Sequence, residues 1–135
     1  MRINHLAAVL AAVVYFLIGW LWYGFIFKAA WIAAVGPAGM AGNSATPYIV
    51  SIVMALVLSY VIAIALGKSE HPQPARQGVE FGLFMGIGIF ASQTLMDSMY
   101  EVRPLALWAI DAGYVVVGMA VIGAIIGAWR VKTPA

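Results

Sequence analysis

The stretch His5–Phe27, HLAAVLAAVVYFLIGWLWYGFIF, decides the fold of this chain. It belongs to a run of 25 residues between Arg2 and Lys28 that contains no Asp, Glu, Lys or Arg. A helix needs about 20 apolar residues to cross the hydrocarbon of a bilayer, so this run is long enough. Because backbone N–H and C=O groups in hydrocarbon must be paired within the segment, the run predicts a transmembrane α-helix.

Three further apolar runs bring the number of predicted spans to four, at about residues 5–27, 48–66, 79–100 and 105–129. Pro104 beside Arg103 favours a turn between the last two spans, since one continuous helix would hold Glu101 and Arg103 in lipid. Hydrophobic residues make up 64% of the chain and charged residues 9%, whereas soluble domains are about one quarter charged. We therefore expect a single all-α integral membrane domain over residues 1–135, a four-transmembrane-helix bundle.

Basic residues are distributed unequally between the two ends of this predicted bundle. Lys28 and Arg103 fall at one end, and five fall at the end shared by both termini: Arg2, Lys68, Arg76, Arg130 and Lys132. The positive-inside rule therefore predicts that both termini are cytoplasmic. A cleaved signal peptide is the competing interpretation of the first span, but its apolar run is longer than a usual signal core.

Composition also excludes several classes of function. Cysteine is absent, which excludes disulfides, thiolate metal sites and cysteine nucleophiles. The net charge of +2 is scattered along the chain, so there is no basic patch for nucleic acid. The sequence contains no HExxH, GxSxG or phosphate-binding loop, and we expect neither an enzyme nor a cofactor.

Two connections differ in character. The segment from Lys28 to Pro47 is rich in Ala and Gly and predicts a short interfacial helix at about residues 29–35, followed by an irregular loop on the outer membrane surface. The segment from Lys68 to Gln77 predicts a short polar cytoplasmic turn.

Small residues recur every four positions in the later spans. Such ridges let helix backbones approach closely, which is the main source of packing energy in lipid. We interpret the ridges as surfaces for packing within the bundle, or alternatively as a homodimer seam. Their residues are Ser51, Ala55, Ser59, Ala63 and Gly67 in the second span, Gly78, Gly82 and Gly86 in the third, and Gly123 and Gly127 in the fourth.

An aromatic cluster ends the first span. Its polar-edged rings favour the headgroup level, so we interpret them as interfacial anchors: Trp20, Trp22, Tyr23 and Trp31. A ligand cage for a cation or a quinone is the alternative, although no acidic residue accompanies the rings on that helix.

Several of these motifs resemble a bacterial membrane family catalogued as domain of unknown function 1761. The resemblance rests on Asn4, GWLWY at residues 19–23, Phe27, Lys28, Trp31, Gly36, Asp111, Gly113, Tyr114 and GAIIGAW at residues 123–129. It implies four membrane helices, and it implies no activity and no catalytic residues. We expect the protein to lie in a bacterial inner membrane as a multi-pass protein. Gly24 departs from the pattern, since we would expect a more variable or polar residue there.

Polar and charged residues cluster where the last two spans meet. Asp97 and Asp111 are predicted at almost the same depth, and the whole cluster comprises Gln93, Asp97, Glu101, Arg103 and Asp111. Arg103 with the hydroxyls of Ser98 and Tyr114 could neutralise the acids, the two aspartates could share a proton as a proton or cation site, or the acids could bind a divalent metal. Metal binding is the weakest of these hypotheses, because no histidine is available at that end.

Two function classes follow. The first is a non-catalytic accessory or scaffold membrane protein, surrounded by the lipid bilayer and assembled as a homo-oligomer or within a larger membrane complex. The alternative is an oligomeric small transporter or channel-like protein that uses Asp97 and Asp111 for a proton or cation.

Overall fold

The computed structural model of the chain describes residues 3–39, 45–67 and 74–129. These residues form helices and no strands, in the order α1 (His5–Leu21), the π-helical turn η1 (Trp22–Ile26), α2 (Lys28–Gly39), α3 (Thr46–Gly67), α4 (Pro74–Met85), the π-helical turn η2 (Gly86–Ala91), α5 (Ser92–Tyr100) and α6 (Leu105–Ala128).

Four of the described helices are long and apolar enough to cross a membrane, which confirms the predicted fold class. They run over His5–Ile26, Thr46–Gly67, Ala75–Tyr100 and Leu105–Ala128. The first joins α1 to η1, and the third joins α4, η2 and α5 into one rod. The chain is thus a multi-pass membrane protein by the length and composition of its helices. Four of the basic residues behind the predicted orientation lie outside the described residues: Arg2, Lys68, Arg130 and Lys132.

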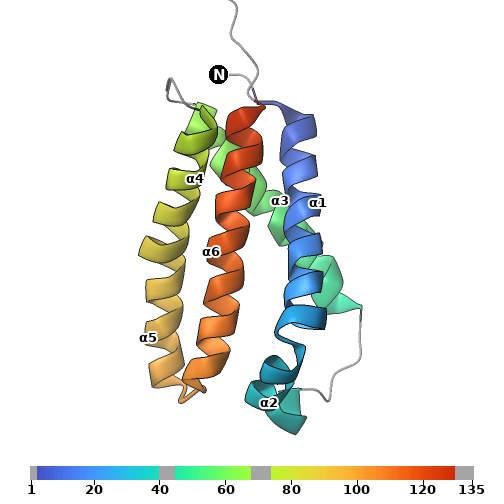
Figure 1. The fold of residues 1–135 in the computed structure, drawn as a ribbon, viewed down its shortest axis with the longest axis vertical. Coiled ribbons are helices and arrows are strands. Elements are labelled where there is room, and N and C mark those ends of the chain that lie inside the picture. The colour runs from blue at the N-terminus through green and yellow to red at the C-terminus, as the bar shows by residue number, and fades with distance from the viewer. Residues whose placement is uncertain (1–2, 40–44, 68–73, 130–135) are drawn as a thin grey trace, which may run out of the picture.

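Helix α6 is the central helix of the bundle (Figure 1). The rod of α4, η2 and α5 runs beside it in the opposite direction, and α1 lies on its other side. Helix α3 crosses obliquely behind α1 and α6. Buried residues recur along the whole of α6, from Ile110 to Gly127, so the core of the bundle lies along this helix.

Glycines hold α4 and α6 together at backbone distance. A methyl group placed on Gly78 would overlap the backbone carbonyl of Gly123, and one placed on Gly82 would overlap the backbone at Met119. A methyl group on Gly86 would lie 3.1 Å from the Cα atom of Val116. This close approach leaves no room for side chains between the helices and maximises dispersion contacts, which stabilise helix pairs in lipid.

Helices α1 and α3 meet through alanine and serine. Ala8 and Ala11 of α1 and Ala55 and Ser59 of α3 are 0–1% exposed. The Ser59 hydroxyl donates a 2.6 Å hydrogen bond to the Ala8 carbonyl oxygen, which joins the two backbones across the seam. Of the other small residues in the second predicted span, Ala63 is buried, Gly67 is half-buried and Ser51 is exposed with its hydroxyl on the Pro47 carbonyl.

Helix α2 follows the first span and breaks within its own length. Gly36 has a φ of 74°, a left-handed backbone conformation that favours glycine, and Pro37 follows it. The short helix that the sequence predicts at residues 29–35 therefore corresponds to the part of α2 before the break. Figure 1 shows α2 at the same end of the bundle as the turn between α5 and α6. Residues 40–44 of the predicted outer loop lie outside the described residues, as do residues 68–73 of the predicted cytoplasmic turn.

Candidate functional site at the turn between α5 and α6

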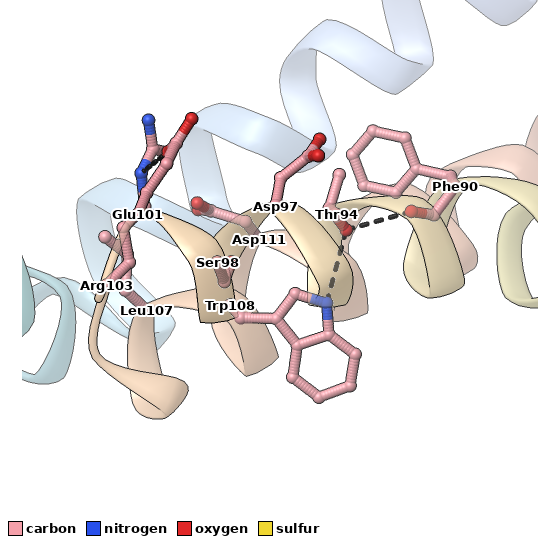
Figure 2. A pocket seen from close by; sticks show the side chains of 9 residues that line it. All are labelled: Phe90, Thr94, Asp97, Ser98, Glu101, Arg103, Leu107, Trp108 and Asp111. Atoms are coloured by element: carbon pink, nitrogen blue, oxygen red, sulfur yellow. Dashed lines mark hydrogen bonds and ion pairs between the residues drawn. The ribbon is translucent and has the colours of Figure 1, made fainter.

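A cavity of about 270 Å³ opens at the end of the bundle where α5 turns into α6 (Figure 2). It will be called the hairpin cavity. Nine residues from η2, α5, the turn and α6 line it: Phe90, Thr94, Asp97, Ser98, Glu101, Arg103, Leu107, Trp108 and Asp111. Four of the five polar residues that the sequence assigns to a candidate site are among them.

The turn itself is a Schellman motif with an unusual residue. The Arg103 N–H donates to the Ser98 carbonyl at 2.9 Å, which is the six-to-one bond of that motif, and Val102 between them has a φ of 54°. Glycine usually occupies this left-handed position, because a β-branched side chain is strained there. Pro104 then caps α6 and prevents α5 from continuing. The motif brings the first turns of α6 alongside the last turns of α5.

Trp108 joins α6 to the π-helical turn η2. Its indole N–H donates to the Ala91 carbonyl at 3.1 Å and to the Thr94 hydroxyl at 3.2 Å, and that hydroxyl in turn donates to the Phe90 carbonyl at 2.9 Å (Figure 2). A π-helical turn alters the regular pairing of helix carbonyls, and such turns occur often at functional sites. Phe90, Thr94 and Trp108 of this network line the hairpin cavity.

Asp111 receives its hydrogen bond from the far side of α6. The Tyr23 hydroxyl in η1 donates to Oδ1 of Asp111 at 2.6 Å, and both residues are half-buried. The Tyr23 ring packs edge-on against Trp31 and Tyr114, with centroid distances of 5.7 and 5.5 Å. Asp111 therefore connects the cavity to the aromatic cluster at the end of the first span.

The remaining charged groups of the predicted cluster pair along the chain. The Gln93 amide donates to Oδ1 of Asp97 at 3.2 Å, and Nε of Arg103 contacts a Glu101 carboxylate oxygen at 2.6 Å. Figure 2 shows Asp97 and the Glu101–Arg103 pair on the same side of α5. No ion pair joins Arg103 to Asp111 among the described residues.

Among the described residues, the hydroxyls of Ser98 and Tyr114 do not bind the acids, although one of the hypotheses from the sequence requires it. The Tyr114 hydroxyl donates to the Tyr15 carbonyl at 2.9 Å, and Tyr23 supplies the hydroxyl that binds Asp111. Ser98 is 6% exposed and lines the cavity, and its hydroxyl makes no hydrogen bond within the described part of the chain. The sequence placed Tyr23 among the anchors, so its contact with Asp111 was missed.

Two of the proposed anchors direct polar atoms into the protein. The Trp22 indole N–H donates to the Ile110 carbonyl at 3.0 Å, as Tyr23 does to Asp111. Trp22 also covers Gly113, where an added methyl group would lie 3.0 Å from the indole ring. Trp20 remains 58% exposed and packs against Phe25, as an interfacial anchor would.

Aromatic rings and glycines alternate along the interface of α1 and α6. Tyr15 fills the space above Gly118, and Tyr114 fills the space above Gly19. The rings of Tyr15 and Tyr114 stack at a centroid distance of 4.7 Å. Each glycine thus provides a position at which a ring from the other helix fits, which places Tyr23 opposite Asp111 two turns further along.

The Asn4 side chain fixes the opposite end of the same helix pair. It accepts from the Ala7 N–H at 3.1 Å as an N-cap of α1, and its amide donates to the Trp129 carbonyl at 3.0 Å at the end of α6. Two pairs of the residues on which the family resemblance rests, Asn4 with Trp129 and Tyr23 with Asp111, therefore meet at the two ends of one interface.

Comparisons with known proteins agree with this resemblance. Residues 6–127 match the family described as "Protein of unknown function (DUF1761)". Comparisons with curated proteins and with solved structures find no match. The family match extends over most of the chain, which therefore belongs to the DUF1761 family.

Proposed function

We propose that this chain is a non-catalytic accessory or scaffold protein of a membrane assembly, and that a second copy of the chain docks on the exposed side of α5. The observation that carries the proposal is a polar face within a membrane-spanning helix. Met96 and Asp97 lie three and four positions after Gln93, Tyr100 lies three positions after Asp97, and all four residues are exposed. We call them the Gln93 face.

The depth of Gln93 makes lipid an unfavourable neighbour. It lies seven residues before Tyr100 at the end of the span, which corresponds to about 10 Å of helix. Its amide donates to Asp97, and this pair uses only part of the hydrogen-bonding capacity of the two side chains. A polar group left partly unpaired in hydrocarbon costs free energy, so a protein surface that satisfies it is favoured.

A second copy satisfies this requirement by symmetry. A two-fold axis beside α5 places the two Gln93 amides opposite one another, and each amide offers both donors and an acceptor. Met96 on the same face supplies flexible apolar contact around the pair. Glutamine side chains that pair across helices stabilise helix association in membranes.

Single-cysteine cross-linking tests this proposal, because the chain contains no cysteine. Met96→Cys, on the Gln93 face, is expected to form a disulfide-linked dimer in native membranes under oxidation. Leu17→Cys is the matched control, since Leu17 is similarly exposed and belongs to α1, which lies on the other side of α6 from α5. Adding Gln93→Leu to Met96→Cys should lower the dimer yield.

Other results separate the occupants of this face. Cross-linking of Met96→Cys to a different membrane protein would contradict the second copy as occupant and support the accessory role. Equal cross-linking at both positions, or a monomer with no partner in native membranes, would contradict docking on the Gln93 face.

A second candidate function is an oligomeric small transporter or channel-like protein. The placement of Asp97 and Asp111 on one cavity favours it. The tight backbone contact of α4 with α6 leaves no room for a path between these two helices, and a chain of four spans is small for a translocation path, so we expect transport to require at least a second copy. If the chain transports a cation, Asp97→Asn and Asp111→Asn should each abolish flux in reconstituted vesicles, and Asp111→Asn, which lies outside the Gln93 face, should preserve assembly. A scaffold should show no flux with either the native chain or these variants.

A further inference from the structure

We propose that the hairpin cavity binds a small organic cation with a primary ammonium group. The charge of the cavity, the unpaired hydroxyl of Ser98 and the aromatic lining point to this ligand class independently of one another. Binding in the cavity requires no partner chain, because all the residues involved belong to one copy.

The charge of the lining favours a cation. Three carboxylates and one guanidinium line the cavity, from Asp97, Glu101, Asp111 and Arg103. The guanidinium contacts Glu101 at 2.6 Å, and Asp97 and Asp111 contact only neutral groups among the described residues, at Gln93 and Tyr23. A carboxylate accepts several hydrogen bonds, so both aspartates retain acceptor capacity that a charged donor can use.

Ser98, a buried residue, supplies a hydroxyl that lines the cavity and has no partner in the described part of the chain. The residue is 6% exposed and lines the same cavity as the two aspartates. Its side chain makes no hydrogen bond in the described part of the chain. Because this hydroxyl lines the cavity and no protein group binds it, a ligand in the cavity can donate a hydrogen bond to it. An ammonium group carries three donors, and the cavity lining offers acceptor oxygens for them on Asp97, Ser98 and Asp111.

The lining also contains apolar surface for an organic substituent. Phe90, Leu107 and Trp108 form this part of the wall. Aromatic rings attract cations through their negative faces, and a short alkyl chain gains from burial against all three side chains. The volume of about 270 Å³ lies just below the range of drug-sized pockets, which begins at about 300 Å³. The volume of the cavity therefore indicates a small ligand.

A divalent metal fits this arrangement less well than an ammonium ion. Among the described residues, no group of three His, Cys, Asp or Glu side chains is close enough to hold one metal ion. Hard divalent cations take six or more oxygen ligands in a compact shell. Spaced carboxylates beside aromatic rings are better suited to a larger and softer cation.

Calorimetric titration of the purified full chain in lipid nanodiscs tests the proposal, with n-butylammonium as the probe. The expected result is saturable binding of n-butylammonium and none of 1-butanol, which has nearly the same size and no charge. Tetramethylammonium should bind at least about fivefold more weakly, because it has the charge and no N–H donors.

Substitutions locate the binding site. Asp97→Asn and Asp111→Asn should each weaken n-butylammonium binding by about tenfold or more, and Ser98→Ala by about fivefold. Asp97→Asn and Ser98→Ala leave the Tyr23–Asp111 hydrogen bond intact, so they remain informative if Asp111→Asn does not fold. Glu80→Gln is the matched control, because Glu80 pairs with Arg76 in α4, at the other end of the bundle. This variant should bind n-butylammonium as the native chain does.

Three results would overturn the proposal. The first is no saturable heat with n-butylammonium, and the second is equal binding of n-butylammonium by the native chain and by Asp97→Asn and Ser98→Ala. The third is tight binding of Mg²⁺ that excludes n-butylammonium, which would assign the carboxylates to a metal.

Discussion

The Tyr23 hydroxyl and the Asp111 carboxylate lie 2.6 Å apart, although 88 residues separate them in the sequence. This hydrogen bond connects the end of the first span to the second turn of α6. It gives the half-buried carboxylate a neutral partner at a depth where an unpaired charge would be costly. It also leaves the other side of Asp111 facing the hairpin cavity.

Removal of this hydroxyl should destabilise the bundle. Tyr23→Phe keeps the ring contacts with Trp31 and Tyr114 and removes the donor to Asp111, so we expect a loss of about 1–3 kcal/mol in unfolding free energy. Thermal unfolding in detergent measures the effect. Tyr48→Phe is the control, because Tyr48 is 64% exposed on α3, and an equal loss in both variants would contradict a specific role for the Tyr23 hydroxyl.

The backbone contact of α4 with α6 predicts a strong difference between two glycines of the same rod. Gly78→Ala should destabilise the bundle by about 1–3 kcal/mol, because the methyl group would overlap the Gly123 carbonyl. Gly88→Ala should be neutral or stabilising, since nothing lies within 4 Å of its added methyl group and alanine favours the helix. Unfolding midpoints that do not separate the two variants would count against this close approach.

Two serines of α3 provide a matched test of the α1–α3 seam. Ser59→Ala removes a buried hydroxyl that bonds the Ala8 carbonyl, and we expect a loss of about 0.5–1.5 kcal/mol. Ser51→Ala removes an exposed hydroxyl that bonds only the Pro47 carbonyl of its own helix, and should change the unfolding free energy little. If Ser51→Ala proves the more costly change, α3 packs through a different face.

The left-handed conformation of Val102 predicts a stabilising substitution. Val102→Gly removes the strain of a β-branched residue at a φ of 54°, which outweighs the added chain entropy, so we expect a gain of about 1 kcal/mol. Ala109→Gly, in the exposed face of α6, should cost about 1 kcal/mol. A lower unfolding temperature for Val102→Gly would show that the turn is not strained.

The helices could be predicted from the sequence because bilayer physics leaves few alternatives. A charge-free run of 25 residues must pair its own backbone groups, and Pro104 cannot continue a helix begun at Pro74. Local rules of this kind do not reveal the π-helical turns η1 and η2, because these depend on how the helix packs against its neighbours.

The candidate site was predictable only along one helix pair. Asp97 and Asp111 could be placed at one level because a short turn joins their helices, and depth follows from the rise per residue. The contact of Tyr23 with Asp111 depends on which face of α1 meets α6, and a helix that is apolar on every side carries no such signal. The pairs of glycine with Tyr15 or Tyr114 decide that rotation, and they become visible only once both helices are in place.

Single-cysteine accessibility tests most directly whether these helices cross a membrane, since the chain has no native cysteine. Ala75→Cys lies at the start of the third span and Val102→Cys just after its end. A membrane-impermeant maleimide should label Val102→Cys in intact expressing cells, and Ala75→Cys only after the membrane is opened. Labelling of both variants from the same side would contradict a membrane-spanning rod between them.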